Sequence, residues 1–284
     1  MSTMAVSRAL LLDLVDDAAV FPPGNAPVER AWSEHLALRA GRYGDLLGPL
    51  LIGISGAASL VDVAAASPGG PVGVAVIARA GTAVTDLLSA VETLAASPWL
   101  TVVAVEVAHD ADGDWRRALS LGVPVAVEVP RDPEAQRVAL DEIAAAVEEA
   151  SHPVLAKLRT QATAQAPAPS PDELAAFLVG TRERGLTFKL TGGLHHAVAG
   201  EDEHGFHHGV LNVLLATHDL SGGASAGAVA ERLDVRDGRA LAEIVRMLDA
   251  ADVAAVRSRL ASFGCCGVTD PLDELHELGI PEGA

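Results

Sequence analysis

Lysine is almost missing from this chain of 284 residues. Of its 20 lysines and arginines, only Lys157 and Lys189 are lysines. An arginine keeps its proton, whereas a buried lysine can lose its proton and form an imine with a carbonyl compound. Both lysines lie in short apolar runs that are typical of strands, P-V-L-A-K-L-R-T and T-F-K-L-T. The sequence therefore favours a chemical reason for keeping an amine at these two positions.

Positive charge and aromatic residues are also scarce. The net charge is −18, the isoelectric point is about 4.8, and aromatic residues make up 3% of the chain. Nucleic acids and anionic membrane surfaces both require a basic face, and stacked bases also need aromatic platforms. The composition therefore argues against both as main partners, and we expect the acidic charge to serve solubility.

The chain has no long apolar run and only two cysteines. No run approaches the ~20 apolar residues of a membrane span, and the one at residues 9–12 is too short for a secretory signal. Cys265 and Cys266 are adjacent, which disfavours a disulfide between them. We therefore expect a cytoplasmic protein whose two free thiols are either core filler or a nucleophile at a strand end.

Apolar runs of strand length alternate with helical patterns along the chain. Such alternation calls for parallel strands joined by crossover helices, and eight units in about 250 residues match a (β/α)8 barrel. We predict one barrel domain over residues 1–284, with a helical insertion at about 194–261 between the last two strands. Its helices are expected at 207–218, 226–233 and 238–260. The predicted strands are 20–21, 50–55, 72–78, 101–107, 124–129, 153–159, 187–191 and 262–268.

Charged side chains interrupt four of the predicted strands. Because side chains alternate across a strand, Glu106, Glu128, Lys157, Arg159 and Lys189 all fall on the face opposite the apolar one. In a barrel this face points inward, toward the mouth at the carboxyl ends of the strands, where such folds place their chemistry. Buried charges need partners, so the alternative is a neutral ion network that only fills the barrel.

Five of the ten histidines follow the seventh predicted strand within one loop. They are His195, His196, His204, His207 and His208. One member of each adjacent pair could join Glu106 or Glu128 as the three protein ligands of a catalytic zinc ion. Otherwise these histidines are acid–base groups or donors to an anion. A lone histidine such as His35 is expected to be a solvated helix residue.

Gly209 and Asn212 stand at the start of an apolar helical run. The helix N-terminus could hold a substrate anion together with Arg159, or the polar residues could simply cap the helix. Thr191, on the inward face of the seventh strand, is a further candidate for substrate binding.

The run K-L-T-G-G-L that begins at Lys189 resembles the seventh strand of deoxyribose-phosphate aldolase and related class I aldolases. Residues 262–267 loosely resemble the phosphate-gripping eighth strand of that family. With the sixth strand, the likeness covers three short patches, about a tenth of the chain. It implies that Lys157 forms the imine, that Lys189 lowers the pKa of Lys157, and that Glu106 or Glu128 carries the proton.

The chain departs from the aldolase pattern at two places. Lys157 is followed by Leu158 and Arg159 instead of a small, hydroxyl-rich run, and the aldolases have no counterpart of the histidine loop. The chain also resembles a group of uncharacterised bacterial barrel proteins with the elements G-L-H-H and H-G-x-L-N. That second likeness implies no activity.

These patterns predict a lyase-type enzyme that acts on a small anionic carbonyl compound and needs no cofactor. Lys157 is the expected nucleophile, Lys189 its electrostatic tuner, and Glu106 or Glu128 the proton carrier. The expected substrate-binding residues are Arg159, Thr191, His195, His196 and Asn212.

Two other functions stay open from the sequence. One is a metal-dependent hydrolase or lyase that holds a divalent ion such as zinc with His195, His196, His207 and His208. The other is a non-catalytic barrel that binds a small molecule. The sequence also leaves a homo-oligomeric state open.

Overall fold

Eight parallel strands form a closed barrel in the computed structural model, which describes residues 8–163, 166–203 and 205–280. The closed order is β1-β10-β7-β6-β5-β4-β3-β2, and every neighbouring pair is parallel. This confirms the predicted (β/α)8 barrel. The strands are β1 (Val15–Asp17), β2 (Leu47–Gly53), β3 (Val72–Ile77), β4 (Leu100–Ala108), β5 (Val125–Glu128), β6 (Val154–Arg159), β7 (Phe188–Thr191) and β10 (Leu260–Cys265).

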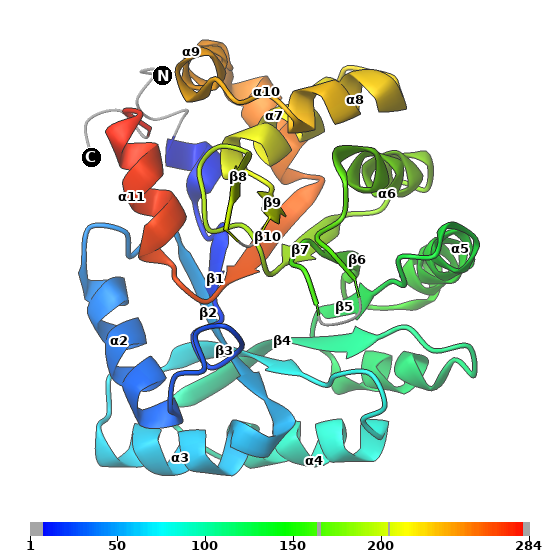
Figure 1. Ribbon diagram of the computed structural model, residues 1–284. Helices are drawn as coiled ribbons and strands as arrows, with labels where there is room; N and C mark the ends of the chain where they lie inside the picture. The colour runs from blue at the N-terminus through cyan, green and yellow to red at the C-terminus, as the bar shows by residue number, and fades with distance from the viewer. Residues whose placement is uncertain (1–7, 164–165, 204, 281–284) are drawn as a thin grey trace.

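Helices surround the strands as an outer layer (Figure 1). The residues between β4 and β5 form a 3-10 helix, η2, which lies between Gly113 and Gly122, both in the left-handed conformation. A segment of only eight residues between two such breaks leaves little room for regular α-helix. The outer elements are α2 (Val28–Ala40), η1 (Ile54–Gly56), α3 (Ala57–Ala66), α4 (Val84–Ala95), η2 (Asp114–Leu121), α5 (Pro133–Glu149), α6 (Pro171–Glu183) and α11 (Thr269–Glu277).

The first strand lies upstream of the predicted one. The prediction of a strand at 20–21 was wrong, because β1 is Val15–Asp17, and all three of its residues are buried. A segment with two aspartates in three residues is not expected to form a barrel strand, because a buried carboxylate is costly unless it has a partner. Here each has one: Asp16 meets Lys189, and Asp17 lies 3.0 Å from the Nδ1 atom of His35. His35 is therefore fully buried, and its prediction as a solvated residue was also wrong.

The segment between β7 and β10 contains a hairpin as well as helices. Strands β8 (Gly200–Asp202) and β9 (Gly205–His207) pair antiparallel, so α7 (Val210–Ser221) begins three residues later than the predicted helix. The helix predicted at 238–260 is divided into α9 (Gly238–Met247) and α10 (Ala250–Arg257). The side chain of Asp249 forms a capping box with Asp252 and so starts α10 as a separate helix. The remaining helix, α8 (Ala226–Leu233), matches its predicted range.

Strand β4 shows the predicted alternation of its two faces near its carboxyl end. In β4, Val105 and Val107 are buried in the main hydrophobic core between the strands and the helices. Glu106, between them, is 1% exposed and points into the barrel. Among the described residues, no helix combines the length and the apolar character that a membrane crossing requires.

Candidate active site at the barrel mouth

Acidic and basic side chains alternate along a chain of contacts inside the barrel. At the end of this chain of contacts near the barrel mouth, the Nε atom of Arg159 donates a hydrogen bond to Oε1 of Glu128 at 3.1 Å. The other oxygen of Glu128 lies 2.8 Å from the Lys157 amine, which also lies 2.7 Å from Oε2 of Glu106. Strands β4, β5 and β6 are neighbours, and their inward residues meet because adjacent parallel strands share the same face orientation.

Glu106 links these contacts near the mouth to a second set of contacts around Lys189. Its Oε1 atom lies 2.5 Å from the Nζ atom of Lys189. The same amine contacts the Asp16 carboxylate, and that carboxylate accepts a hydrogen bond of 2.8 Å from the Ser262 hydroxyl. The chain of contacts thus holds three cations and three carboxylates, and it joins both lysines through one glutamate. The predicted convergence of the five inward charges is confirmed.

The electrostatics differ along this chain of charges. Burial disfavours the charged form of Glu106, but Lys157 and Lys189 outweigh burial and lower its pKa to about 2. Burial likewise opposes the charge on Lys189, but Asp16 and Glu106 outweigh it and raise the Lys189 pKa. The pKa of Asp16 is raised, because burial outweighs the contacts with Lys189 and Ser262. Glu106 and Lys189 are therefore fixed as a carboxylate and an ammonium.

The two lysines line separate cavities at opposite ends of the barrel. Lys157 lines a mouth cavity of about 720 Å³, together with Glu128, Arg159 and Arg79. Lys189 lines a separate cavity at the other end, beside Asp16. The expectation that both amines face the mouth was therefore wrong. Their strands pair with Lys157 opposite Lys189, but the tilt of barrel strands sets neighbouring residues at different heights.

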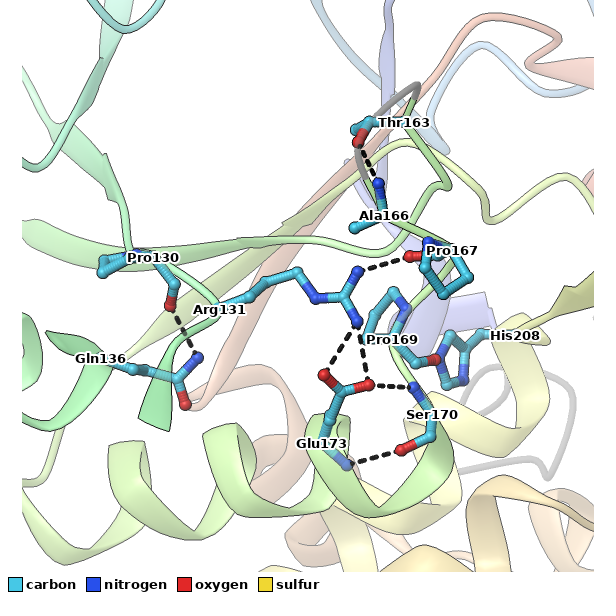
Figure 2. Close-up of polar contacts among 10 residues, drawn as sticks. All are labelled: Pro130, Arg131, Gln136, Thr163, Ala166, Pro167, Pro169, Ser170, Glu173 and His208. Atoms are coloured by element: carbon cyan, nitrogen blue, oxygen red, sulfur yellow. Dashed lines mark hydrogen bonds and ion pairs between the residues drawn. The ribbon is translucent and has the colours of Figure 1, made fainter. Parts of the chain in front are cut away.

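The loop after β6 forms one wall of the mouth cavity through Gln161 and Thr163. Figure 2 shows how its far side is held: Arg131 contacts the carbonyl of Pro167 and both oxygens of Glu173, at 2.8 and 2.9 Å. His208 donates from Nε2 to the carbonyl of Pro169 at 2.8 Å. These contacts tie Pro167 and Pro169 to the loop after β5 and to the residues that precede α7.

The loop after β7 approaches the same wall closely. Gly192 and Gly193 have φ values of 67° and 75°, which favour glycine. A Cβ atom on Gly193 would lie 2.8 Å from the carbonyl oxygen of Thr160. The Thr191 side chain lines the mouth cavity just before this turn. The glycine pair therefore lets the loops after β6 and β7 touch and turns the chain toward His195.

His195 lies in the mouth cavity against both cysteines. Its Nε2 atom is 3.3 Å from the sulfur of Cys266, and its Nδ1 atom is 3.0 Å from Oδ2 of Asp270 and 3.6 Å from the sulfur of Cys265. The two sulfurs and the carboxylate raise the pKa of His195. Both cysteines are free; Cys265 is buried, and burial raises its pKa, whereas Cys266 is partly exposed and lines the cavity. Cys266, His195 and Asp270 are thus spaced like a nucleophile, a base and an orienting carboxylate.

The four histidines of the predicted metal set do not converge. His195 faces the cysteines, while His208 is buried, bonded to Pro169, and has a pKa that burial lowers to about 4. Glu106 and Glu128, their predicted partners, are engaged by the lysines. Only His196 and His207 meet, with ring centroids 4.0 Å apart. His204 lies outside the described residues.

Asn212 is fully buried and away from the mouth cavity. Its amide oxygen accepts a 2.8 Å hydrogen bond from the backbone N–H of Ala199. Its amide nitrogen donates to the carbonyls of Arg232 and Val235 at 3.0 and 2.8 Å. The structure therefore places Asn212 where it holds the insertion together, with every polar atom of its side chain occupied.

Sequence reasoning missed three polar residues of the site. Asp16 of β1 contacts Lys189, Ser262 of β10 donates a hydrogen bond to Asp16, and Asp270 of α11 lies against His195. The local signal for Asp16 was weak, because Asp13 and Asp17 flank it and the segment does not have the pattern of a buried strand. No local pattern marks Asp270, because it meets His195 across 75 residues of sequence.

Comparison with protein-family models and with curated proteins finds no match to this chain.

Proposed function

We propose that this chain is a class I aldolase-like lyase that forms an imine between Lys157 and a small anionic carbonyl compound. The observation that carries the proposal is the position of the Lys157 amine, which lines the mouth cavity while two carboxylates hold it from within. Lys189 is not the nucleophile, because Asp16 and Glu106 keep it protonated and it faces the other end of the barrel.

The surroundings of Lys157 suit an imine as well as an amine. Condensation of a protonated lysine with a carbonyl compound releases one water molecule and leaves a protonated imine, so the nitrogen keeps its positive charge. Glu106 and Glu128 therefore pair with the cation before and after the reaction. A protonated imine withdraws electrons from the neighbouring carbon, which is what cleavage of a carbon–carbon bond requires.

Glu128 is better placed than Glu106 to carry the proton. The Lys157 ammonium must lose a proton before it attacks, and that proton must later reach the departing hydroxyl group. Glu128 contacts the amine at 2.8 Å and lines the mouth cavity. Glu106 is buried between two lysines that lower its pKa to about 2, so it is a poor base.

Two arginines favour an anionic substrate. Arg159 and Arg79 both line the mouth cavity. Arg159 uses its Nε atom for Glu128 and has a side chain that is 39% exposed, which leaves donors of its guanidinium group for a carboxylate or phosphate. His195 lines the same cavity and could bind or protonate the substrate. A cytoplasmic location belongs to this proposal, since a reducing compartment keeps both cysteines as thiols.

Reductive trapping tests the proposal cleanly, because the chain has only two lysines. Tag-free protein is incubated with pyruvate, glyoxylate or a small phosphorylated aldehyde, reduced with borohydride, and read by intact mass and peptide mapping. We expect one adduct per chain, on Lys157. Lys157→Arg should abolish this adduct and leave only background labelling of the N-terminal amine.

Lys189→Arg is the matched control, since it keeps a positive charge as the partner of Glu106 and removes the second lysine amine. It should still be labelled at Lys157. Failure to label Lys157 with any compound of the panel would count against imine chemistry. Unchanged ligand affinity in both arginine variants would instead favour a barrel that binds a small molecule without catalysis.

A further inference from the structure

A second constellation of ligand groups lies beside the mouth cavity, in the segment after β7. Among the described residues, His196, Asp202 and His207 form the one group of three or more potential metal ligands whose ligand atoms all lie within 4.8 Å of one another. None of the three lines the mouth cavity. Their arrangement is therefore separate from the lysine chemistry proposed above.

The pairing of the β8–β9 hairpin places two of these side chains on one face. Gly200 is directly opposite His207, and Asp202 is two residues further along the same strand. Because side chains alternate along a strand, Asp202 and His207 project from the same side of the hairpin, as diagonal neighbours. Gly200 has no side chain there, and a Cβ atom would lie 2.7 Å from Nε2 of His207. The glycine therefore lets the His207 ring lie over the hairpin.

His196 reaches this face from the loop after β7. Its carbonyl accepts a 3.0 Å hydrogen bond from the N–H of Val210, which fixes the loop against the start of α7. Its Nδ1 atom lies 2.8 Å from Oε1 of Glu274, and the other oxygen of Glu274 accepts from the N–H of Ala197 at 2.7 Å. A carboxylate at Nδ1 selects the tautomer with a free Nε2 lone pair, the arrangement commonly found behind metal-binding histidines.

The contact between His207 and Asp202 is closer to the spacing of two ligands of one ion than to a direct hydrogen bond. Nδ1 of His207 lies 3.7 Å from Oδ2 of Asp202, which is too long for a hydrogen bond. Two ligand atoms of a tetrahedral zinc ion, each about 2.0–2.1 Å from the metal, are roughly 3.4 Å apart. The same Nδ1 atom is buried, and no described residue forms a hydrogen bond with it. A buried nitrogen acceptor without a donor is costly, and a metal ion would satisfy it.

We infer that His196, Asp202 and His207 bind one transition-metal ion, with zinc the best match. Two imidazoles and one carboxylate suit a metal of intermediate softness, and three protein ligands leave a fourth position open to water or to a small ligand. The ion joins the loop after β7, the hairpin β8–β9 and, through Glu274, helix α11. Residue 195 of that loop lines the mouth, so the ion also fixes the wall that carries His195.

Metal titration of tag-free protein, first stripped with a chelator, tests this site. We expect one zinc per chain by elemental analysis after gel filtration. Cobalt(II) should give the intense visible absorption of a tetrahedral ion, without a thiolate charge-transfer band, which would indicate binding by Cys265 or Cys266. Asp202→Asn and His207→Gln should each weaken binding by more than about 100-fold, and Glu274→Gln by about 10–100-fold.

His218→Gln is the matched control, because His218 also lies near two aspartates, Asp219 and Asp252, at 3.5 and 3.3 Å. It should bind zinc as the parent protein does. Circular dichroism establishes that each variant is folded, and Asp202→Asn, on an exposed side chain, remains informative if His207→Gln unfolds. Sub-stoichiometric zinc in the parent protein, or unchanged affinity in the folded ligand variants, would overturn the inference. Borohydride trapping reports on Lys157, and none of the three ion ligands lines the mouth cavity, so the two proposals can fail separately.

Discussion

Glu106 is the residue through which the two lysines depend on each other. Its two oxygens lie 2.7 and 2.5 Å from the amines of Lys157 and Lys189, inside a barrel that buries all three side chains. A neutral side chain at this position would leave two buried cations short of a counter-charge. Removing one partner of a buried ion pair is far more costly than the pair itself is stabilising.

Glu106→Gln is therefore expected to lower the free energy of unfolding by about 3–5 kcal/mol, as measured by urea denaturation. Glu128→Gln is the comparison, because Glu128 is closer to solvent and its loss still leaves Lys157 paired with Glu106. Glu128→Gln should lower the free energy of unfolding by clearly less than Glu106→Gln does. Equal effects of the two variants would mean that the inner ion pairs do not hold the barrel together.

The two cysteines differ in access although they are adjacent. Cys266 lines the mouth cavity and lies 3.3 Å from Nε2 of His195, whereas Cys265 is fully buried and burial raises its pKa. Iodoacetamide should therefore alkylate Cys266 at least tenfold faster than Cys265, since the thiolate is the reactive form. Mass spectrometry of Cys265→Ala and Cys266→Ala separates the two rates. Faster reaction of the thiol at 265 would show that the end of β10 opens in solution.

At the scale of elements, the loops decide the shape of the mouth. Helix α6 begins at a complete capping box, in which the Ser170 hydroxyl accepts from the N–H of Glu173 and the Glu173 carboxylate accepts from the N–H of Ser170. Arg131, from the loop after β5, binds the same glutamate (Figure 2). One carboxylate thus starts the helix and ties the loop after β6 to the loop after β5.

Ser170→Ala should lower the free energy of unfolding by about 1 kcal/mol, the usual cost of a lost N-cap. Ser225→Ala provides a reference, because Ser225 caps α8 through Ala228 without a reciprocal glutamate. If the network around α6 adds stability, Ser170→Ala will cost more than Ser225→Ala in thermal and urea unfolding. A smaller cost at Ser170 would contradict a cooperative network.

At the scale of the whole molecule, the buried charges make stability depend on acidity. The pKa of Glu106 falls to about 2 in the folded chain, and that of Glu128 is also lowered. A carboxyl with a depressed folded pKa stabilises the fold at pH values above its unfolded value, about 4.5, and loses that contribution as pH falls toward 2. Asp16 acts in the opposite sense, because its pKa is raised and its protonation favours the folded state.

The free energy of unfolding should therefore decrease as pH falls from about 4.5 toward 2, as measured by urea titration at each pH. The decrease should be smaller in Glu106→Gln, which has no carboxyl to protonate at this position. Glu128→Gln serves the same purpose if the first variant is too unstable. A parent and variant with parallel pH profiles would show that the barrel charges are not coupled to folding.

The fold followed from the sequence because its signals are local. Buried strands such as β2 and β6 read as short apolar runs, and period-two alternation placed Glu106 and Lys157 inside the barrel before any tertiary contact was considered. The same local logic failed at β1, where the pairing of Asp16 and Asp17 with distant residues makes a charged strand possible. It also failed in the hairpin β8–β9, whose strands are only three residues long.

The sequence alone determined that the chain has only two lysine side chains and that both lie on the inward faces of neighbouring strands. Only the tertiary structure decided which amine faces the mouth, that one glutamate joins the two, and that His196 meets Asp202 and His207 while His195 meets the cysteines. Side-chain direction repeats every two residues and can be read from a short segment. Strand tilt and loop closure bring together residues far apart in sequence, so they can be known only from the folded chain.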